Sequence, residues 1–449
     1  MEARYAQRKT ELLQDCQVEP EVFDQVIARL HHFLEPFVSS LSGQAPPRHA
    51  RTYISGLLSD VKRKNVESIA YHFGQERLGL QGFIGWEDWD DAPMRQELLH
   101  QVGQQLGHRD GVLVFDPSAF PKSGRESVGV ARQWCGRLGK VDNCQVAIYL
   151  GYVSRKGHTL VDQRLFLPKD WTQDKTRLKK AGVPKERRGY RTRHQLALEM
   201  LGQDGAWLPH RWLAGDDEMG RPYWFRHRLR EWNERYLFAV PSNTSIRALE
   251  VAEPEYGGNG RRPKRPWQSV SEWTDGLAEK DRKRLEVRDG SKGPLVVEAV
   301  KCRVVSRTHR RQPGDEELLV VIRYLDREEQ EVVKVDYYLS NAPATTGLGE
   351  LARVAKAAHR IEECLERSKS EAGLADYEVR HWRGWQHHQT LSLLATWFLE
   401  RETQRGKKMD PSDHVTADSP GHRHDLAAGV GAQHQSAFVV AMPEALTTQ

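Results

Sequence analysis

The segment 111–117, Gly-Val-Leu-Val-Phe-Asp-Pro, decides how the middle of the chain is interpreted. Four consecutive apolar residues, from Val112 to Phe115, are followed by Asp116 and a proline. Such a run is typical of a short strand that is buried on both faces, as in a sheet covered by helices. The segment therefore predicts a sheet-based core, with Asp116 at the carboxyl end of its first strand.

Beyond this strand, strand-like and helical segments alternate along the chain. Further strands are predicted over 145–153, 160–167, 212–216 and 236–240, and helices over 194–201 and 222–234. The order of these elements predicts a mixed α/β sheet flanked by helices.

The regions outside the core differ from it in pattern. Residues 1–105 place apolar side chains at helical spacing, and residues 242–346 contain a Gly/Pro/Arg-rich loop followed by β-rich segments over 294–305, 317–324 and 331–339. The expected regions are N-terminal helices (1–105), the first part of the core (106–241), a β-rich insertion (242–346), C-terminal helices of the core (347–408) and a disordered tail (409–449).

The net charge hides a strong local asymmetry. The 449 residues include 67 Lys and Arg against 62 Asp and Glu, a formal charge of +5. The stretch 175–193 holds nine basic residues and one acid, and 261–265 is Arg-Arg-Pro-Lys-Arg. Basic segments of this kind are either solvated loops or a surface for a polyanion such as DNA.

Several classes of protein are excluded by what the sequence lacks. It has no apolar run of about 18 residues that would cross a membrane, and its charged start lacks the apolar centre of a signal peptide. Its five cysteines are scattered without a CxxC pair, and no P-loop, HExxH or GxSxG motif occurs. We therefore expect a cytoplasmic protein without a membrane partner, a disulfide framework or a cysteine zinc site.

Three acids lie at positions that suit a metal site. Asp116 and Asp216 each follow a predicted strand, and Glu362 lies on the helix predicted after the insertion. Carboxylates at the ends of neighbouring strands, with one from a helix, suit Mg²⁺ or Mn²⁺, and two such ions would serve phosphodiester chemistry. Taken singly, an acid after a strand is more often a turn or cap residue.

A lysine and an arginine on the same predicted helix are candidate phosphate contacts. Lys369 follows Glu362 by seven residues and so falls on the same helical face, while Arg360 is the alternative contact. An exposed helix lysine with no ligand is the competing interpretation for Lys369.

At these residues the chain resembles the DDE transposases of bacterial insertion sequences, and more narrowly the DDE superfamily endonucleases. The matching segments are FPKSG (120–124), SVGVARQ (127–133), LGKVDNCQV (138–146), LPKDW (167–171), GDDEMG (215–220), RIEE (360–363) with Lys369, and GLADYEVRHWRGW (373–385). The resemblance covers roughly residues 20–408.

The resemblance implies an RNase H-like core in which Asp116, Asp216 and Glu362 bind the metal ions, with a β-rich insertion between the second and third acids. It implies that Lys369 belongs to the family's Arg–Glu–Lys helix. The expected partners are transposon-end and target DNA, contacted by the N-terminal helical region and by basic side chains, and a second copy of the chain in the synaptic complex. The DNA-contact candidates are Lys122, Arg360, Lys369, Arg261, Arg262, Lys264 and Arg265.

Two positions have competitors. Asp217 adjoins Asp216, which is preferred because it precedes Gly220 by four residues, as in the family. Glu363 and Glu378 compete with Glu362, which combines the Ile-Glu-Glu position with a lysine seven residues later. The tail after Lys408 departs from the basic, helical C-terminus of the family.

The sequence thus predicts a bacterial, nucleoid-associated DNA transposase that cleaves transposon ends and transfers the freed 3′-hydroxyl into target DNA. The competing hypothesis is a non-catalytic DNA-binding protein derived from a transposase, such as an end-binding repressor. A protein that only binds DNA has no need of all three acids.

Overall fold

The computed structural model describes residues 25–258, 264–290, 293–326 and 331–409. The tail predicted over 409–449 lies outside the described residues apart from Met409, as do Arg261 and Arg262. Among the residues described, no helix combines the length and the apolar character needed to span a membrane.

The chain divides into two compact units, each built from segments that are far apart in sequence. The first unit comprises 1–107, 117–209 and 361–449, and the second comprises 108–116 and 210–360. Two of the four boundaries between the units fall inside strand β1 (Val112–Pro121) and inside the long helix α13 (Leu348–Ser370).

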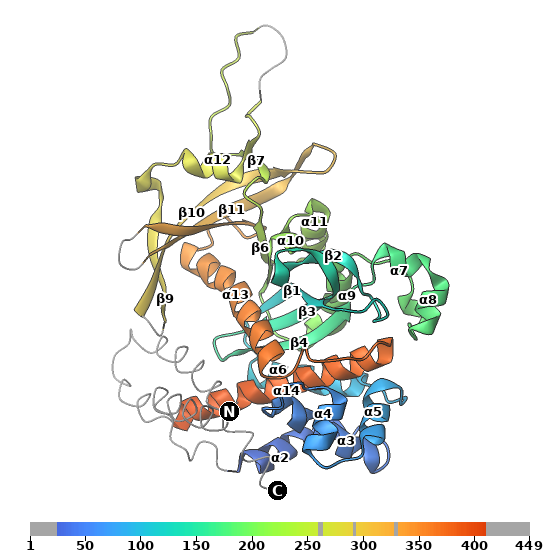
Figure 1. Cartoon of the computed structure of the whole chain (residues 1–449). Helices are drawn as coiled ribbons and strands as arrows, with labels where there is room; N and C mark the ends of the chain where they lie inside the picture. The colour runs from blue at the N-terminus through green and yellow to red at the C-terminus, as the bar shows by residue number, and fades with distance from the viewer. Residues whose placement is uncertain (1–24, 259–263, 291–292, 327–330, 410–449) are drawn as a thin grey trace. The chain divides into compact units, whose positions relative to one another are not determined.

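The first unit contains most of the helices. They are α2 (Val26–Val38), α3 (Ala45–Leu58), α4 (Val66–His72), α5 (Arg77–Gly85), α6 (Ala92–Gln105), α7 (Lys169–Gln173), α8 (Lys175–Lys180), α9 (Arg193–Asp204) and α14 (Trp382–Met409). Helix α2 buries Val26, Leu30, Phe33, Leu34 and Phe37, a single apolar face at helical spacing. Helix α14, orange-red in Figure 1, packs against α3, α5 and strand β4 (His158–Leu165).

Helix α14 is longer than the helix of 391–401 suggested by the apolar pattern alone. Its first turns contain His387, His388 and Gln389. The two adjacent histidines are predicted from the sequence to be surface or helix-packing residues. All three are buried, because each finds a polar partner: Tyr53 lies 2.8 Å from Nδ1 of His388, and the Tyr149 hydroxyl donates to Gln389 (2.6 Å). Hydrogen bonding thus replaces apolar character along this part of the helix.

The first unit also contains the strands β2 (Ala131–Cys135) and β3 (Lys140–Val153), which form an antiparallel hairpin, and β4, which pairs with β3. Strand β3 neighbours β1, and directly after β1 the backbone N–H of Lys122 donates to the carbonyl of Asn143 (2.9 Å). Helices α6, α9 and α14 pack on β4.

The second unit is dominated by one sheet. Its strands run in the order β1-β5-β6-β12-β11-β10-β7-β8, with β9 beside β10. The strands are β5 (Trp212–Gly215), β6 (Tyr236–Val240), β7 (Ser245–Ala248), β8 (Gln268–Ser269), β9 (Lys283–Gly290), β10 (Gly293–Arg307), β11 (Pro313–Leu325) and β12 (Val332–Ser340), and the short helices are α10 (Asp217–Gly220), α11 (Tyr223–Glu231) and α12 (Val270–Asp275).

Two kinds of strand pairing meet in this sheet. Strands β1, β5 and β6 are parallel, whereas β12 pairs antiparallel with β6, so the β-rich segment continues the same sheet. The apolar face of the β-rich part buries Val240, Ile246, Val304, Leu319, Val321 and Leu339 in one cluster. Helix α10 packs on β5 and β6.

The predicted fold class, a mixed α/β sheet flanked by helices, is confirmed. Strand β1 is shared between the neighbours β4-β3-β1 of one unit and β1-β5-β6 of the other.

Strand β1 does not end at Asp116-Pro117, as its sequence suggested, but runs on to Pro121. Its pairing with β5 ends at Phe115, so Pro117 lies where β5 requires no backbone N–H.

Candidate active site

The first candidate acid, Asp116, is positioned by the buried half of β1. Val112, Leu113, Val114 and Phe115 are all inaccessible to solvent, and they pair in parallel with the four residues of β5. Asp116 is the next residue along the strand and is half-buried. The apolar run therefore places this carboxylate in the middle of β1, directly after the last residue that pairs with β5.

The second candidate acid, Asp216, lies at the equivalent place on the neighbouring strand. Gly215 of β5 is paired with Phe115 of β1. The next residue on each chain segment is therefore an acid, Asp216 after Gly215 and Asp116 after Phe115, and the two lie side by side. Neighbouring strands are about 4.8 Å apart. The structure thus brings together two acids separated by 100 residues of sequence.

Glycine is needed at the pairing position before Asp216. A Cβ atom on Gly215 would lie 2.8 Å from the carbonyl oxygen of Phe115 and 3.0 Å from the ring of Phe238. Such contacts are closer than atoms tolerate, so a larger residue would push β5 away from β1. The glycine keeps the two acid-bearing strands in close register.

A cap interaction orients the Asp216 side chain. Its Oδ1 accepts the backbone N–H of Met219 (3.0 Å), which makes Asp216 the N-cap of α10. The adjacent Asp217 is exposed and forms an ion pair with Arg221 (3.2 Å). The two neighbouring acids therefore differ: Asp216 adjoins Asp116, while Asp217 is a surface residue of the short helix.

A buried ion pair supports α10 from the other end. Arg226 of α11 donates to both carboxylate oxygens of Glu317 (2.7 and 3.2 Å) and also to the carbonyl of Gly220, the last residue of α10. Tyr236 and Ser306 each donate to Glu317 (2.7 Å). Burial opposes ionisation of Glu317, but Arg226 and these hydrogen bonds outweigh it and lower the pKa of its carboxyl group.

The ion pair of Arg226 and Glu317 could not be predicted from the sequence. Arg226 stands in the strongly basic helix YWFRHRLRE, where an arginine is expected to face solvent, and its partner is 91 residues away. No local pattern distinguishes it from the exposed Arg228 on the same helix.

The third candidate acid, Glu362, is exposed on α13 and belongs to the first unit. Its helix is held in place by the residue before it. A Cβ atom on Gly151 of β3 would collide with the side chain of Ile361, so this glycine permits close packing of α13 on β3. Of the competing acids, Glu363 is also exposed, and Glu378 accepts a hydrogen bond from Asn65 (3.0 Å).

The basic candidates near α13 occupy different environments. The ammonium group of Lys369 lies 5.7 Å from the ring centroid of Phe120, and Arg360 is half-buried on α13. Lys122 instead donates to the carbonyl of Tyr377 (3.1 Å) and lies over the ring of the same residue (3.4 Å). Burial lowers the pKa of Lys122 to about 8. This geometry favours an anchoring role for Lys122 over a phosphate contact.

The remaining basic candidates belong to the loop before β8. Lys264 is exposed, whereas Arg265 donates to the carbonyl of Val251 (2.6 Å). Trp267, which follows them, is contacted by two arginines, with Arg247 at 4.3 Å and Arg307 at 5.5 Å from its ring. Trp267 is therefore packed within the second unit.

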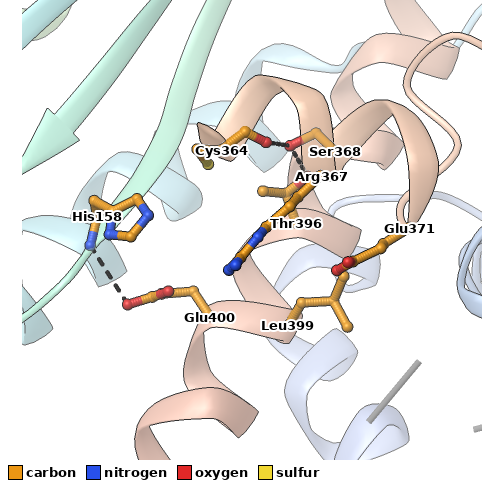
Figure 2. A pocket seen from close by; sticks show the side chains of 8 residues that line it. All are labelled: His158, Cys364, Arg367, Ser368, Glu371, Thr396, Leu399 and Glu400. Atoms are coloured by element: carbon orange, nitrogen blue, oxygen red, sulfur yellow. Dashed lines mark hydrogen bonds between the residues drawn. The ribbon is translucent and has the colours of Figure 1, made fainter. Parts of the chain in front are cut away.

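One small cavity lies in the first unit beside α13 (Figure 2). Its volume is about 20 Å³, and its lining consists of His158, Cys364, Arg367, Ser368, Glu371, Thr396, Leu399 and Glu400. Hydrogen bonds link the His158 backbone N–H to Glu400 (3.4 Å), the Ser368 hydroxyl to the carbonyl of Cys364 (2.7 Å) and the Thr396 hydroxyl to Ser368 (3.0 Å). A cavity of this size holds about one water molecule and no nucleotide.

The paired acids suit a hard divalent cation by the chemistry of their donors. Two adjacent carboxylates repel each other when both are ionised, and oxygen ligands are those that Mg²⁺ and Mn²⁺ prefer. Within the described ranges, no three His, Cys, Asp or Glu side chains gather in an arrangement that could hold a metal ion. The structure therefore shows a pair of candidate ligands in the second unit and Glu362 separately in the first.

The sequence of this chain matches a known protein family. The model of the DDE superfamily endonucleases matches residues 36–294, more than half of the chain. The chain belongs to the DDE superfamily endonucleases. Members of this superfamily generally use divalent metal ions, in keeping with the acids that directly follow the β1–β5 pairing.

Individual relatives of this DDE endonuclease are more distant. It is 25% identical over 333 residues to a probable transposase for insertion sequence element IS701 from Microchaete diplosiphon, which covers 73% of this chain and 75% of the relative.

Among solved structures, the piggyBac transposase synaptic complex with hairpin DNA matches at 11% identity and a TM-score of 0.40, over 93% of this chain and 80% of that one. The NurA nuclease from Sulfolobus solfataricus matches at 11% identity and a TM-score of 0.27, over 62% of this chain and 91% of that one. Neither structural likeness is close enough to support an argument about this chain.

Proposed function

We propose that this DDE endonuclease is a DNA transposase of the bacterial cytoplasm. It cleaves DNA at transposon ends and joins the freed 3′-hydroxyl to target DNA. In the first step the oxygen of water bonds to phosphorus and the bond from phosphorus to the 3′ oxygen breaks. In the second step that 3′ oxygen attacks a phosphodiester of the target and displaces the 3′ oxygen of the target strand.

The observation that carries the proposal is the parallel register of β1 and β5. It places Asp116 and Asp216 directly after the paired residues of the two strands, in a chain that belongs to a superfamily of endonucleases. We propose that these two acids and Glu362 hold two divalent cations. The cations would activate the attacking oxygen and stabilise the leaving oxygen of the phosphodiester.

The protein's own groups have separate tasks in this proposal. Asp216 stays oriented because its Oδ1 is capped by the N–H of Met219. Lys369 and Arg360 would contact phosphates of the transposon end, and Arg261, Arg262, Lys264 and Arg265 would contact more distant DNA. Because two ends must be joined, we propose that the working form is a dimer of this chain.

A cleavage assay with the purified full chain tests the proposal. The substrate is a supercoiled plasmid carrying the DNA that flanks this gene on both sides, incubated with Mg²⁺ or Mn²⁺ and analysed for nicked and linear forms. We expect Asp116→Asn and Asp216→Asn to lower the cleavage rate at least about a thousandfold, since metal stabilisation of the transition state amounts to several kcal/mol.

Asp217→Asn is the matched control, because Asp217 is an exposed acid one residue from Asp216. Asparagine caps a helix as well as aspartate does, so Asp216→Asn should fold normally. Equal nicking by the wild-type chain and Asp116→Asn would overturn the catalytic assignment. Binding to the flanking DNA without any cleavage would instead support a non-catalytic DNA-binding protein.

A further inference from the structure

The hairpin of β2 and β3 in the first unit has one buried and one exposed face. On the buried face, Cys135 and Cys144 pack with Val146 against Ala119 and Phe166. This packing fixes the hairpin to the body of the unit, so its opposite face is held outward.

The outward face combines a large aromatic residue with basic residues. Trp134 and Val141 are cross-strand partners, and they are 56% and 52% exposed. Arg132, two residues before Trp134 on the same strand, is also exposed on this face. An exposed tryptophan beside an exposed valine is unusual for a surface that contacts only water.

The turn of the hairpin extends the positive charge. Residues 131–141, Ala-Arg-Gln-Trp-Cys-Gly-Arg-Leu-Gly-Lys-Val, contain three basic residues and no acid. Arg137 and Leu138 are exposed in the turn, while Lys140 forms an ion pair with Asp142 (3.1 Å).

A second aromatic and basic group adjoins the other face of the hairpin, because Gln133 alternates with Trp134 along β2 and Phe166 packs against Cys135 and Cys144. Arg193, the first residue of α9, donates to the Gln133 side chain (3.4 Å) and lies 5.0 Å from the ring centroid of Phe166. Phe166 in turn makes an edge contact with Tyr190 at 6.3 Å, and the ammonium group of Lys169 lies 5.4 Å from the Tyr190 ring. Tyr190 is 42% exposed. In Figure 1 these segments belong to the teal and green part around β2, α7 and α9.

We propose that the outward face of this hairpin and its turn, consisting of Arg132, Trp134, Arg137 and Val141, bind an unpaired DNA strand. An exposed aromatic ring flanked by cations matches such a strand, because a base stacks on the ring and phosphates meet the cations. Bases in a duplex are already stacked and are not available to the ring, which favours the unpaired strand. The inference rests on the proposed function and extends it to the form of DNA that the chain holds.

A binding experiment without divalent cations separates this inference from catalysis. The probes are a fluorescently labelled 20-nucleotide oligothymidylate and a 20-base-pair duplex, titrated with the full chain in EDTA while anisotropy is recorded. We expect Trp134→Ala to weaken oligothymidylate binding by about 5- to 150-fold, as stacking on one base is worth. Trp134→Phe should restore most of the affinity.

Two further variants sharpen the test. Trp207→Ala removes another exposed tryptophan of the same unit, 50% accessible, and should leave binding unchanged. Arg132→Gln should reduce the slope of log affinity against log salt by about 0.7, the value for one phosphate of a single strand.

Three results would overturn the inference. One is equal binding of oligothymidylate by Trp134→Ala and the wild-type chain, and another is a loss of affinity that affects the duplex alone. The third is self-association of the wild-type chain without DNA that Trp134→Ala abolishes, since the surface would then be an interface between copies. Unchanged melting temperatures exclude misfolding as the cause.

The failure of this inference differs from the failure of the proposed function. Binding that depends on Trp134, without any cleavage of the plasmid, would uphold the inference and overturn the proposed function alone.

Discussion

Two pairs of neighbouring acids in this molecule differ in their burial and in the positive charges around them. Asp116 and Asp216 are half-buried where the parallel pairing of β1 and β5 ends, in the second unit. Asp162 and Asp204 lie in the first unit, where both are almost fully buried. Two carboxylates held close together repel, and burial increases the cost of their charge. A nearby positive charge can offset this repulsion between the two carboxylates.

The buried pair is balanced by the chain itself. Arg164 donates to Asp162 and lies 3.9 Å from Asp204, and Arg95 donates to Asp162 (3.3 Å). Burial, and then the charge of Asp162, raise the pKa of Asp204 to about 8, whereas its arginines lower the pKa of Asp162 despite burial. One acid is thus ionised and paired, and the other keeps its proton over most of the physiological range.

The pair that follows the β1–β5 pairing is only half-buried. Its Asp216 is oriented by a backbone N–H group, which positions a carboxylate without neutralising it. The buried pair thus has counter-charges from within the fold, whereas the half-buried pair lies where solvent reaches its carboxylates.

The largest expected effect comes from removing the internal counter-charge of the buried pair. Arg164→Met should lower the free energy of unfolding by about 3–5 kcal/mol, because it removes one of the two arginines that pair with the buried Asp162 carboxylate. Chemical denaturation measures the change. Arg132→Met, at an exposed arginine of the same unit, serves as the control and should change stability by less than about 0.5 kcal/mol. Equal losses in both variants would contradict a special role for the buried network.

The next effect is the stabilisation of the folded chain by a divalent cation bound to Asp116 and Asp216. Mn²⁺ at a hundred times its dissociation constant should stabilise the wild-type chain by about 2.7 kcal/mol through preferential binding to the folded state. The double variant Asp116→Asn/Asp216→Asn should lose this stabilisation, as measured by melting temperature with and without Mn²⁺. Asp162→Asn should retain the metal-dependent shift, although its own stability is lower. A full shift in the double variant would contradict metal binding by Asp116 and Asp216.

The protonated state of Asp204 predicts a dependence of stability on pH. Its pKa in the folded chain lies above its ordinary value, so its contribution is fully present below about pH 4 and is lost as the pH rises through about 8. Within this window the single proton gives a slope of about 1.4 kcal/mol per pH unit. Asp204→Asn should remove that slope, which denaturation at a series of pH values would reveal. A variant with the wild-type slope would show that Asp204 is ionised in the fold.

The smallest effect is expected at Asp217, the exposed neighbour of Asp216. Asp217→Asn breaks a surface ion pair with Arg221, which is worth about 0–1 kcal/mol. Stability should therefore change by less than about 1 kcal/mol, and plasmid cleavage should stay within about twofold of wild type, because the paired carboxylates are untouched. Loss of cleavage in this variant, with Asp216→Asn active, would exchange the roles of the two acids.

Local patterns predicted most of the elements that surround the acids. The apolar run 112–115 is a buried strand, the segments 294–305 and 317–324 fall within strands of the second unit, and 331–339 matches β12 to within one residue. These predictions succeed because alternation and apolar runs are properties of consecutive residues. The same patterns missed the true length of α14, whose buried polar residues depend on partners from distant segments.

The basic stretch 175–193 shows how charge in a sequence is changed by folding. Arg177 lies over the ring of Trp171 (3.7 Å), and Arg187 and Arg191 both form ion pairs with Glu199 (2.9 and 2.5 Å). Part of its positive charge is therefore used inside the first unit. The exposed basic and aromatic surface that remains belongs to the β2–β3 hairpin and its neighbours, which no count of basic residues would single out.

The class of the fold and the candidate acids could be predicted from local patterns, because strand and helix periodicity and motif spacing are properties of consecutive residues. Which acids become neighbours, and which charges are neutralised, depends on contacts between distant segments. The pairing of Phe115 with Gly215, and of Arg226 with Glu317, joins residues about a hundred positions apart. Such pairings follow from how strands and helices pack together, so no local stretch of sequence contains them.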